Sequence, residues 1–157
     1  MEGGEDIDWK KNNGVMAVAD GDRLYLAVGE GTRFGSYYYN TPTIPVNGQL
    51  LAFDRHTGKF LWKQAVEKQN LVVSQMSYTP ILLLMNFQYE RKMNFGFSSM
   101  QLMAIDKQNG HILANEKLAS SGLQAVTTNM AERYVEVRTY NMRIRLLASD
   151  TETAASN

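Results

Sequence analysis

The segment Gln49–Trp62, QLLAFDRHTGKFLW, occurs a second time in the chain as Gln101–Ala114, QLMAIDKQNGHILA. Aligned without gaps, the two copies agree at six of fourteen positions, and four further positions exchange similar residues. The copies are offset by 52 residues, and an internal repeat of about this length is typical of proteins that stack one supersecondary unit several times. The repeat therefore decides the class of fold.

Each copy consists of an apolar run, a polar turn and a second apolar run. Two short β-prone runs around a glycine-containing turn indicate a β-hairpin. Asp54 and Asp106 are expected to accept hydrogen bonds from the turn amides, while Gly58 and Gly110 are expected to adopt positive φ. We interpret these four residues as structural turn residues. Because the apolar runs do not alternate with polar residues, both faces of the strands should be buried.

A third, incomplete copy lies at Arg145–Asp150, RLLASD, which aligns with Gln101–Asp106 and is expected to lack the second strand of its hairpin. Further β-prone runs surround the three copies, and no stretch shows sustained helical periodicity. The fold class predicted is all-β, with antiparallel units of four strands. The additional strands are expected at Gly14–Ala19, Leu24–Val28, Leu71–Ser74, Ile81–Phe87, Leu123–Thr127, Tyr134–Thr139 and Arg143–Ser149.

The first copy resembles the pyrroloquinoline-quinone-like (PQQ-like) repeat, whose core pattern is A-x-D-x-x-T-G-x-x-x-W. Five residues match that pattern: Ala52, Asp54, Thr57, Gly58 and Trp62. The second copy keeps the alanine, aspartate and glycine but has Asn109 for threonine and Ala114 for tryptophan. The resemblance covers about residues 14–150, and the layout is similar to the C-terminal part of larger bacterial PQQ-like repeat proteins.

This resemblance implies a β-propeller segment with blades at about 14–64, 70–118 and 122–150, between a flexible lead-in at 1–13 and a polar tail at 151–157. Trp62 is then expected to pack between blades. Because propellers need about four to eight blades to close a ring, the missing blades should come from a parent chain or from other copies. The residues around Ile7–Trp9 are expected to fill the outermost strand position of the third blade.

Composition limits the classes of partner. Sixteen Lys and Arg residues balance sixteen Asp and Glu residues, so no net charge draws the chain to nucleic acid or to an anionic membrane. The chain has no cysteine, which excludes disulfides, thiolate catalysis and cysteine-based zinc sites. No apolar run is long enough to span a membrane. The start, MEGGEDIDWK, does not read as a secretory signal, so localisation is left open between periplasm and cytoplasm.

Residue patterns for catalysis or metal binding are weak. His56 and His111 occupy non-equivalent positions of the two copies, which favours solvated turn residues over a pair of metal ligands. No G-x-S-x-G motif is present, and no nucleophile is spaced with a base. PQQ dehydrogenases resemble one another in a vicinal cysteine pair, a calcium site and a central funnel. A cysteine-free chain of about three blades does not fit that pattern, so we expect no catalytic residues, no metal and no cofactor.

Aromatic and basic residues gather in two long segments that we expect to be loops, Gly29–Gly48 and Gln88–Phe97. In a propeller, loops at equivalent positions of neighbouring blades emerge on one face, and tyrosine with arginine is favoured at interfaces. These segments therefore predict a binding surface for protein, peptide or carbohydrate, unless the rings fold inward to cap the blades. The candidate surface consists of Arg33, Phe34, Tyr37, Tyr38, Tyr39, Tyr89, Arg91, Lys92, Phe95 and Phe97.

Three functions are compatible with these patterns. The first is a non-enzymatic binding or scaffolding module of PQQ-like repeat type, with a protein or further propeller blades as partner. The second is a fragment of a quinoprotein oxidoreductase whose cofactor site lies outside this chain. The third is a carbohydrate-handling propeller enzyme, which would need acids such as Asp22, Glu30 and Glu90 to converge.

Overall fold

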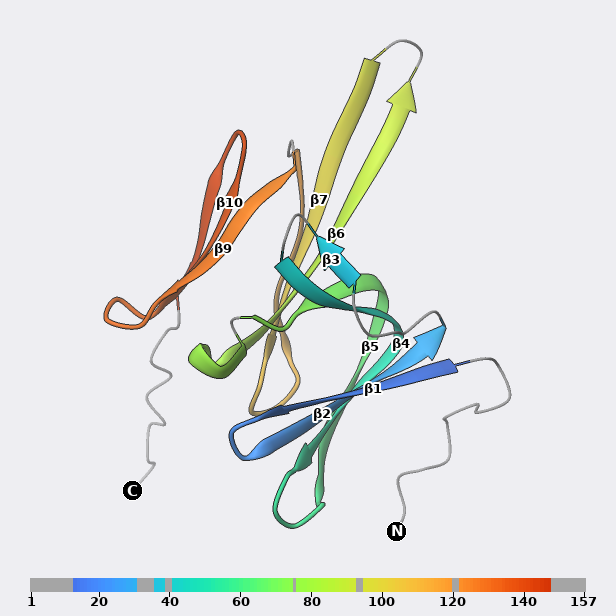
Figure 1. Cartoon of the computed structure of the whole chain (residues 1–157), viewed down its shortest axis with the longest axis vertical. Coiled ribbons are helices and arrows are strands. Elements are labelled where there is room, and N and C mark those ends of the chain that lie inside the picture. Colours follow the sequence, from blue (N-terminus) through green and yellow to red (C-terminus); the bar gives the residue numbers. More distant parts are fainter. Residues whose placement is uncertain are drawn as a thin grey trace, which may run out of the picture.

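The computed structural model describes residues 13–30, 36–38, 41–74, 76–92, 95–119 and 122–147, with backbone only for 13, 36–38, 89–92 and 95–98. Within these ranges the chain forms strands and one short 3-10 helix, without an α-helix. The all-β prediction is confirmed (Figure 1). The elements are β1 (Asn13–Asp20), β2 (Arg23–Glu30), β3 (Ser36–Tyr38), β4 (Thr41–Asp54), β5 (Phe60–Val72), η1 (Met76–Tyr78), β6 (Ile81–Lys92), β7 (Phe95–Asp106), β8 (Ile112–Ala119), β9 (Leu123–Asn129), β10 (Tyr134–Thr139) and β11 (Arg143–Leu147).

The strands form two antiparallel sheets. The larger has the order β1-β2-β4-β5-β6-β7-β8, with β3 paired to β4, and the smaller has the order β11-β10-β9. Strands that follow one another in the chain are neighbours in the sheet almost throughout, as in a meander. The smaller sheet lies beside β6 and β7 as a separate sheet (Figure 1). The predicted four-strand unit in the first part of the chain is confirmed as β1, β2, β4 and β5.

The two segments expected to be loops were predicted wrongly, because both contain long stretches of strand. β6 and β7 remain paired as far as Lys92 and Phe95. In the other segment β3 pairs with the start of β4, with Tyr37 opposite Pro42. Aromatic residues favour strands, and an antiparallel hairpin lengthens for as long as both of its strands can keep pairing. Tyr37, Tyr38, Tyr89, Phe95 and Phe97 therefore lie in strands and not in loops.

β5 also differs from the prediction, because Leu71 and Val72 end this strand and do not begin a new one. The pairing expected for Leu71 is nevertheless present, since it lies opposite Leu84 of β6. Only one further pair, Asn70 with Met85, joins β5 to β6. β5 therefore pairs with β4 along most of its length and with β6 near its end, so the first two units share one strand.

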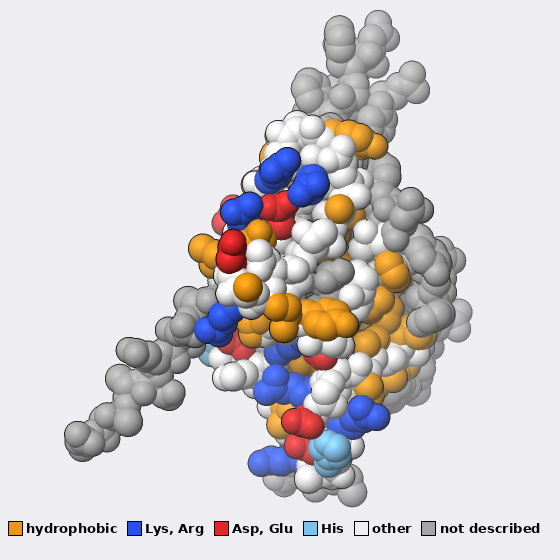
Figure 2. All heavy atoms as spheres, turned by 60° about the vertical axis from the view of Figure 1, so that its left-hand side comes forward, with side chains coloured by type: hydrophobic (Ala, Val, Ile, Leu, Met, Phe, Trp, Pro, Cys, Tyr) orange, Lys and Arg blue, Asp and Glu red, His pale blue; other side chains and the backbone are white. Residues whose placement is uncertain are grey.

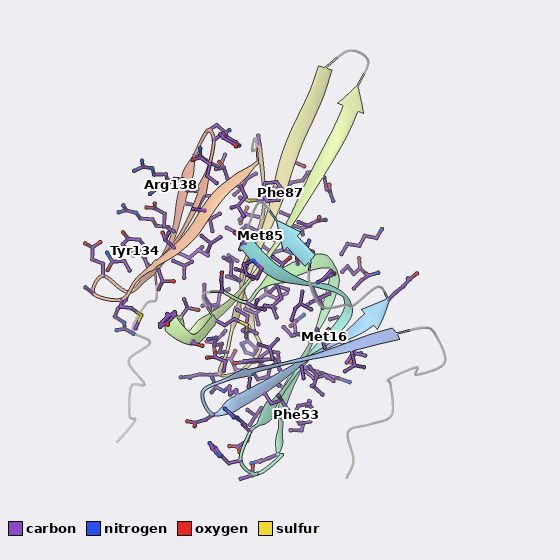
Figure 3. All side chains as sticks on the ribbon, in the orientation of Figure 1. Met16, Phe53, Met85, Phe87, Tyr134 and Arg138 are labelled. Atoms are coloured by element: carbon purple, nitrogen blue, oxygen red, sulfur yellow. The ribbon has the colours of Figure 1, made fainter. Side chains whose placement is uncertain are left out.

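The apolar core consists of two clusters on opposite faces of the β6–β8 hairpins. Leu84 and Ile105 pack with residues of β2, β4 and β5 in the first cluster. Met85 and Leu102 pack with residues of β9 and β10 in the second, and Figure 3 shows Met85 and Phe87 on the side of β6 near the smaller sheet. Fully burying such a side chain contributes roughly 1.5–3 kcal/mol. The predicted two-sided burial is confirmed for the first strand of the second copy, residues 102–105, and is wrong for its return strand, where Ile112 and Leu113 are exposed.

The two repeated turns have the predicted geometry. The Asp54 carboxylate accepts hydrogen bonds from the amides of His56 (3.0 Å) and Thr57 (2.7 Å) and from the Thr57 hydroxyl (2.8 Å). These bonds, from Thr57 first, hold the pKa of Asp54 below its ordinary value. Asp106 accepts a bond from the Gln108 amide at 2.6 Å. Gly58 and Gly110 have φ of 70° and 76°, which an L-residue adopts only at a cost.

Trp62 joins the first copy of the hairpin to the second. Its indole is buried and donates a hydrogen bond of 2.9 Å from Nε1 to the carbonyl oxygen of Lys107. The ring lies so close to Gly110 that a Cβ there would be 2.6 Å from it. On its other side the ring contacts Tyr25, with 5.9 Å between centroids. The predicted packing of Trp62 against the next unit is confirmed.

Lys107 is a buried charge at the same junction. Its ammonium pairs with the Asp20 carboxylate and donates to the carbonyl oxygen of Met76. Burial lowers the pKa of Lys107, and the pairing with Asp20 opposes that shift. A buried ammonium needs such partners because its desolvation is costly. The turn of the second copy is thereby fixed to both β1 and η1.

Candidate functional site

The β9–β11 sheet has one apolar and one polar face because its residues alternate along each strand. Val135 and Val137 of β10 face the core, together with Val126, Ile144 and Leu146. The opposite face carries charged and polar side chains, and Figure 3 shows Tyr134 and Arg138 on the side away from Met85. We call this surface the arginine face. It consists of Thr127 of β9, Tyr134, Glu136 and Arg138 of β10, and Arg143 and Arg145 of β11.

Glu136 lies at the centre of the arginine face and is only 4% exposed. Its two carboxylate oxygens accept separate bonds, from Arg138 Nη2 at 2.8 Å and from Arg145 Nε at 2.9 Å. The strand register places Arg145 directly opposite Glu136. The bond from Arg138, and then that from Arg145, holds the pKa of the Glu136 carboxyl below its ordinary value. Glu136 is therefore an anion that orients two guanidinium groups.

Both guanidinium groups remain open to solvent while Glu136 holds them. The side chain of Arg138 is 42% exposed and that of Arg145 is 54% exposed. Arg145 also lies over the Tyr134 ring, 4.6 Å from its centroid, which is a cation–π geometry. Arg143 lies on the same face of β11 as Arg145 and is exposed. The face is hollowed by a polar concavity of about 410 Å³, and Figure 2 shows blue side chains gathered around red ones there.

An apolar pocket of about 240 Å³ adjoins the arginine face at the β9–β10 turn. It lies between η1 and the smaller sheet, and it shares Asn129, Met130 and Tyr134 with the polar concavity. Several of its apolar side chains are open to solvent, among them Leu147, which is 73% exposed. We call this pocket the apolar notch. Its apolar lining consists of Tyr78, Pro80, Ile81, Met130, Tyr134, Val135, Leu146 and Leu147.

A family model described as outer membrane protein assembly factor BamB matches residues 35–156, which is most of the chain. The chain belongs to this family. The match confirms the resemblance to PQQ-like repeats, and with the antiparallel sheets it makes the chain a β-propeller repeat module. No curated protein and no solved structure gives a significant match.

In this BamB-like chain the predicted aromatic surface lies largely outside the described side chains. Arg33, Phe34 and Tyr39 are outside the described residues, as are Ile7–Trp9. The others lie in parts of strands for which the backbone alone is described. Tyr37 and Tyr38 are in β3, while Tyr89, Arg91 and Lys92 are in β6 and Phe95 and Phe97 are in β7. The binding surface predicted from these residues stays a prediction.

The two histidines of the BamB-like chain lie in the repeated turns. His56 Nε2 is 3.2 Å from the Asp22 carboxylate, and both side chains are largely exposed. The His111 amide bonds to the Asn109 side chain at 2.8 Å. Within the described ranges no group of three or more histidines and acids is placed to bind a metal. Asp22 lies in the turn just before β2 and Glu30 ends that strand, roughly 25 Å apart at about 3.3 Å per residue.

Sequence reasoning missed both buried charges, Lys107 and Glu136. The alternation of Val135 and Val137 with Glu136 and Arg138 indicates a strand with one polar face, and the structure has such a face. The pattern at β11, Arg143 and Arg145 around Ile144, is the same signal. Reading the two strands as a pair would have brought the three arginines together. Across the described part of the chain, no helix is long and apolar enough to cross a membrane.

Proposed function

We propose that this chain is a non-enzymatic propeller segment of three blades that serves as a protein-binding module. The observation that carries the proposal is the arginine face. One side of the β9–β11 sheet is buried in the core, while the other presents three arginines around one buried glutamate. A sheet face with oriented, partly exposed charges suits recognition of a partner, since arginine is favoured at interfaces.

The repeated polar residues support a structural use of the rest of the chain. The carboxylates of Asp54 and Asp106 accept hydrogen bonds from turn amides, and the Lys107 ammonium forms an ion pair with Asp20. None of these groups is placed to attack or protonate a substrate. The family is described as an outer membrane protein assembly factor, and an assembly factor works through contact with other proteins. The arginine face is the part of the described surface best equipped for such contact.

The carbohydrate-enzyme alternative is not favoured by the acids it would use. Glycoside hydrolysis needs two carboxyl groups within about 10 Å, and Asp22, just before β2, lies roughly 25 Å from Glu30 at the end of that strand. The side chain of the third acid, Glu90, lies outside the described residues. The alternative of a quinoprotein fragment assigns its cofactor site to residues beyond this chain, and so it predicts nothing for the arginine face. Of the three functions, only the binding module assigns a function to the arginine face.

Site-specific photo-crosslinking in the native cell tests the proposal. Benzoylphenylalanine in place of Thr127, which is exposed on the arginine face, should give a discrete cross-linked product with another protein. The matched control places the same residue at Lys63, which is exposed on β5. The absence of a product at Thr127, or the same products at both positions, would contradict the proposed function.

A further inference from the structure

We infer that the arginine face binds an extended acidic segment of a protein partner, whose Asp or Glu carboxylates pair with Arg143 and Arg145. The inference rests on the function proposed above and names the chemistry of the partner. Its first support is charge. The face holds three guanidinium groups and one carboxylate, Glu136, while Glu132 and Arg133 in the adjoining turn offset each other.

The arginines have donors to spare. Glu136 accepts from one nitrogen of Arg138 and one of Arg145, and each guanidinium carries five N–H donors. Within the described ranges the Arg143 side chain forms no hydrogen bond or ion pair with another residue. Planar guanidinium forks match carboxylates in bidentate geometry.

Two of the three cations are already oriented before a ligand arrives. The Glu136 carboxylate holds Arg138 and Arg145, and the Tyr134 ring lies under Arg145. Donors fixed in this way lose less side-chain entropy on binding than free arginines do. Because Glu136 is buried beneath them, the guanidinium groups separate its negative charge from an incoming anion.

Spacing and strand pairing favour an extended peptide over a small anion. Arg143, Arg145 and Leu147 alternate along β11 with inward residues, so neighbours on the face are roughly 7 Å apart. An extended segment with an acid at every second residue has the same spacing. Within the described ranges β11 pairs only with β10, so an extended segment can add to its other edge where the residues around Ile7–Trp9, which the sequence predicts there, do not fill it. The apolar notch beside Leu147 can receive an apolar side chain of the same partner.

Fluorescence anisotropy tests the inference with a short labelled peptide that alternates glutamate and valine. We expect the wild-type chain to bind it with an affinity that falls as salt rises, because surface charges are screened. Arg143→Gln should weaken binding about tenfold, the loss of one charge-assisted contact. Lys63→Gln removes the same charge from β5 and should leave binding unchanged. Because Arg143 is exposed, both variants should melt at the wild-type temperature.

Three outcomes would overturn the inference. They are equal binding of a control peptide with glutamine in place of glutamate, unchanged affinity in Arg143→Gln, and no binding by the wild-type chain. Complete competition by millimolar inorganic phosphate, with no gain from the peptide valines, would instead identify a site for free anions. If Thr127 cross-links a protein but the acidic peptide does not bind, the module function stands and the acidic partner is wrong. If the peptide binds but Thr127 yields no product, the module function fails.

Discussion

The two copies of the repeated hairpin share their turns but differ in what surrounds them. In both, the aspartate amide donates across the turn at 2.8 Å, to Lys59 in the first copy and to His111 in the second. The residue after each aspartate differs in its setting. The Arg55 side chain is exposed and donates from Nη1 to the carbonyl oxygen of Gly21 at 3.4 Å, whereas Lys107 is buried. Local turn chemistry is thus repeated, while tertiary contacts are set by the neighbouring unit.

Removing the contact that joins the copies should have the largest effect. Trp62→Ala deletes a buried ring and leaves the carbonyl oxygen of Lys107 without its donor, so we expect a loss of about 3–5 kcal/mol in the free energy of unfolding. Urea unfolding followed by circular dichroism measures it. Leu61→Ala, at a position that is 38% exposed, is the control. Equal losses in the two variants would contradict the junction described here.

Replacing the buried cation Lys107 should have the second-largest effect on the free energy of unfolding. Lys107→Met leaves Asp20 buried beside an apolar side chain, and breaking a buried pair in this way costs about 3 kcal/mol or more. Arg55→Met makes the same change at the equivalent exposed position, where we expect less than about 0.5 kcal/mol. Urea unfolding measures the difference in stability between the two variants, which is the contribution of the buried position in the second copy over the exposed position in the first. A small effect at Lys107 would mean that the ion pair does not stabilise the junction.

The two turn glycines offer a matched pair with a smaller difference. Gly58→Ala meets no atom within 4 Å, so it should cost only the positive φ, about 1–2 kcal/mol. Gly110→Ala adds a clash with the Trp62 ring, for which we expect a further 1–3 kcal/mol. The extra cost should vanish in the Trp62→Ala background. If it persists there, the ring is not what restricts residue 110.

Substitution of Asp54 should have the smallest effect on stability, and this effect should depend on pH. Because hydrogen bonds lower its folded-state pKa, its ionised form stabilises the fold above the unfolded-state pKa, and that stability is lost as pH falls through the folded-state pKa. Asp54→Asn should therefore be less stable than wild type at pH 7, with the gap closing in acid. Thr57→Val removes the hydrogen bond from the Thr57 hydroxyl to the Asp54 carboxylate, so it should show part of the same difference in stability from wild type. A gap that is constant with pH would refute this role.

Most of the fold was predictable because it depends on local signals. The Asp–Gly turns, the continuous apolar runs and the predicted β9–β11 strands all appear, with β10 in full agreement at Tyr134–Thr139. The hairpin lengths were not predictable, since pairing as far as Lys92 and Phe95 depends on both strands at once. Nor was the shared strand, because nothing in the sequence near Leu71 marks that β5 pairs there with β6 as well as with β4.

The candidate site was hidden for a related reason. Glu136 and Arg145 are nine residues apart in sequence and meet only through strand register. The aromatic residues that stood out in the sequence lie on β3, β6 and β7, whereas the arginines of β10 and β11 looked like an ordinary solvated strand. An ion pair between neighbouring strands, such as that of Glu136 with Arg145, can be predicted only after the strands have been paired with one another.

The continuity of β5 has a consequence for anyone who would lengthen or shorten this array. Because Phe60–Val72 serves two neighbouring units, a cut between them severs backbone hydrogen bonds on both sides, and neither piece keeps a complete set of strands. A truncated variant should therefore be cut elsewhere. The boundary that leaves the larger sheet whole lies after β8, before the second sheet begins.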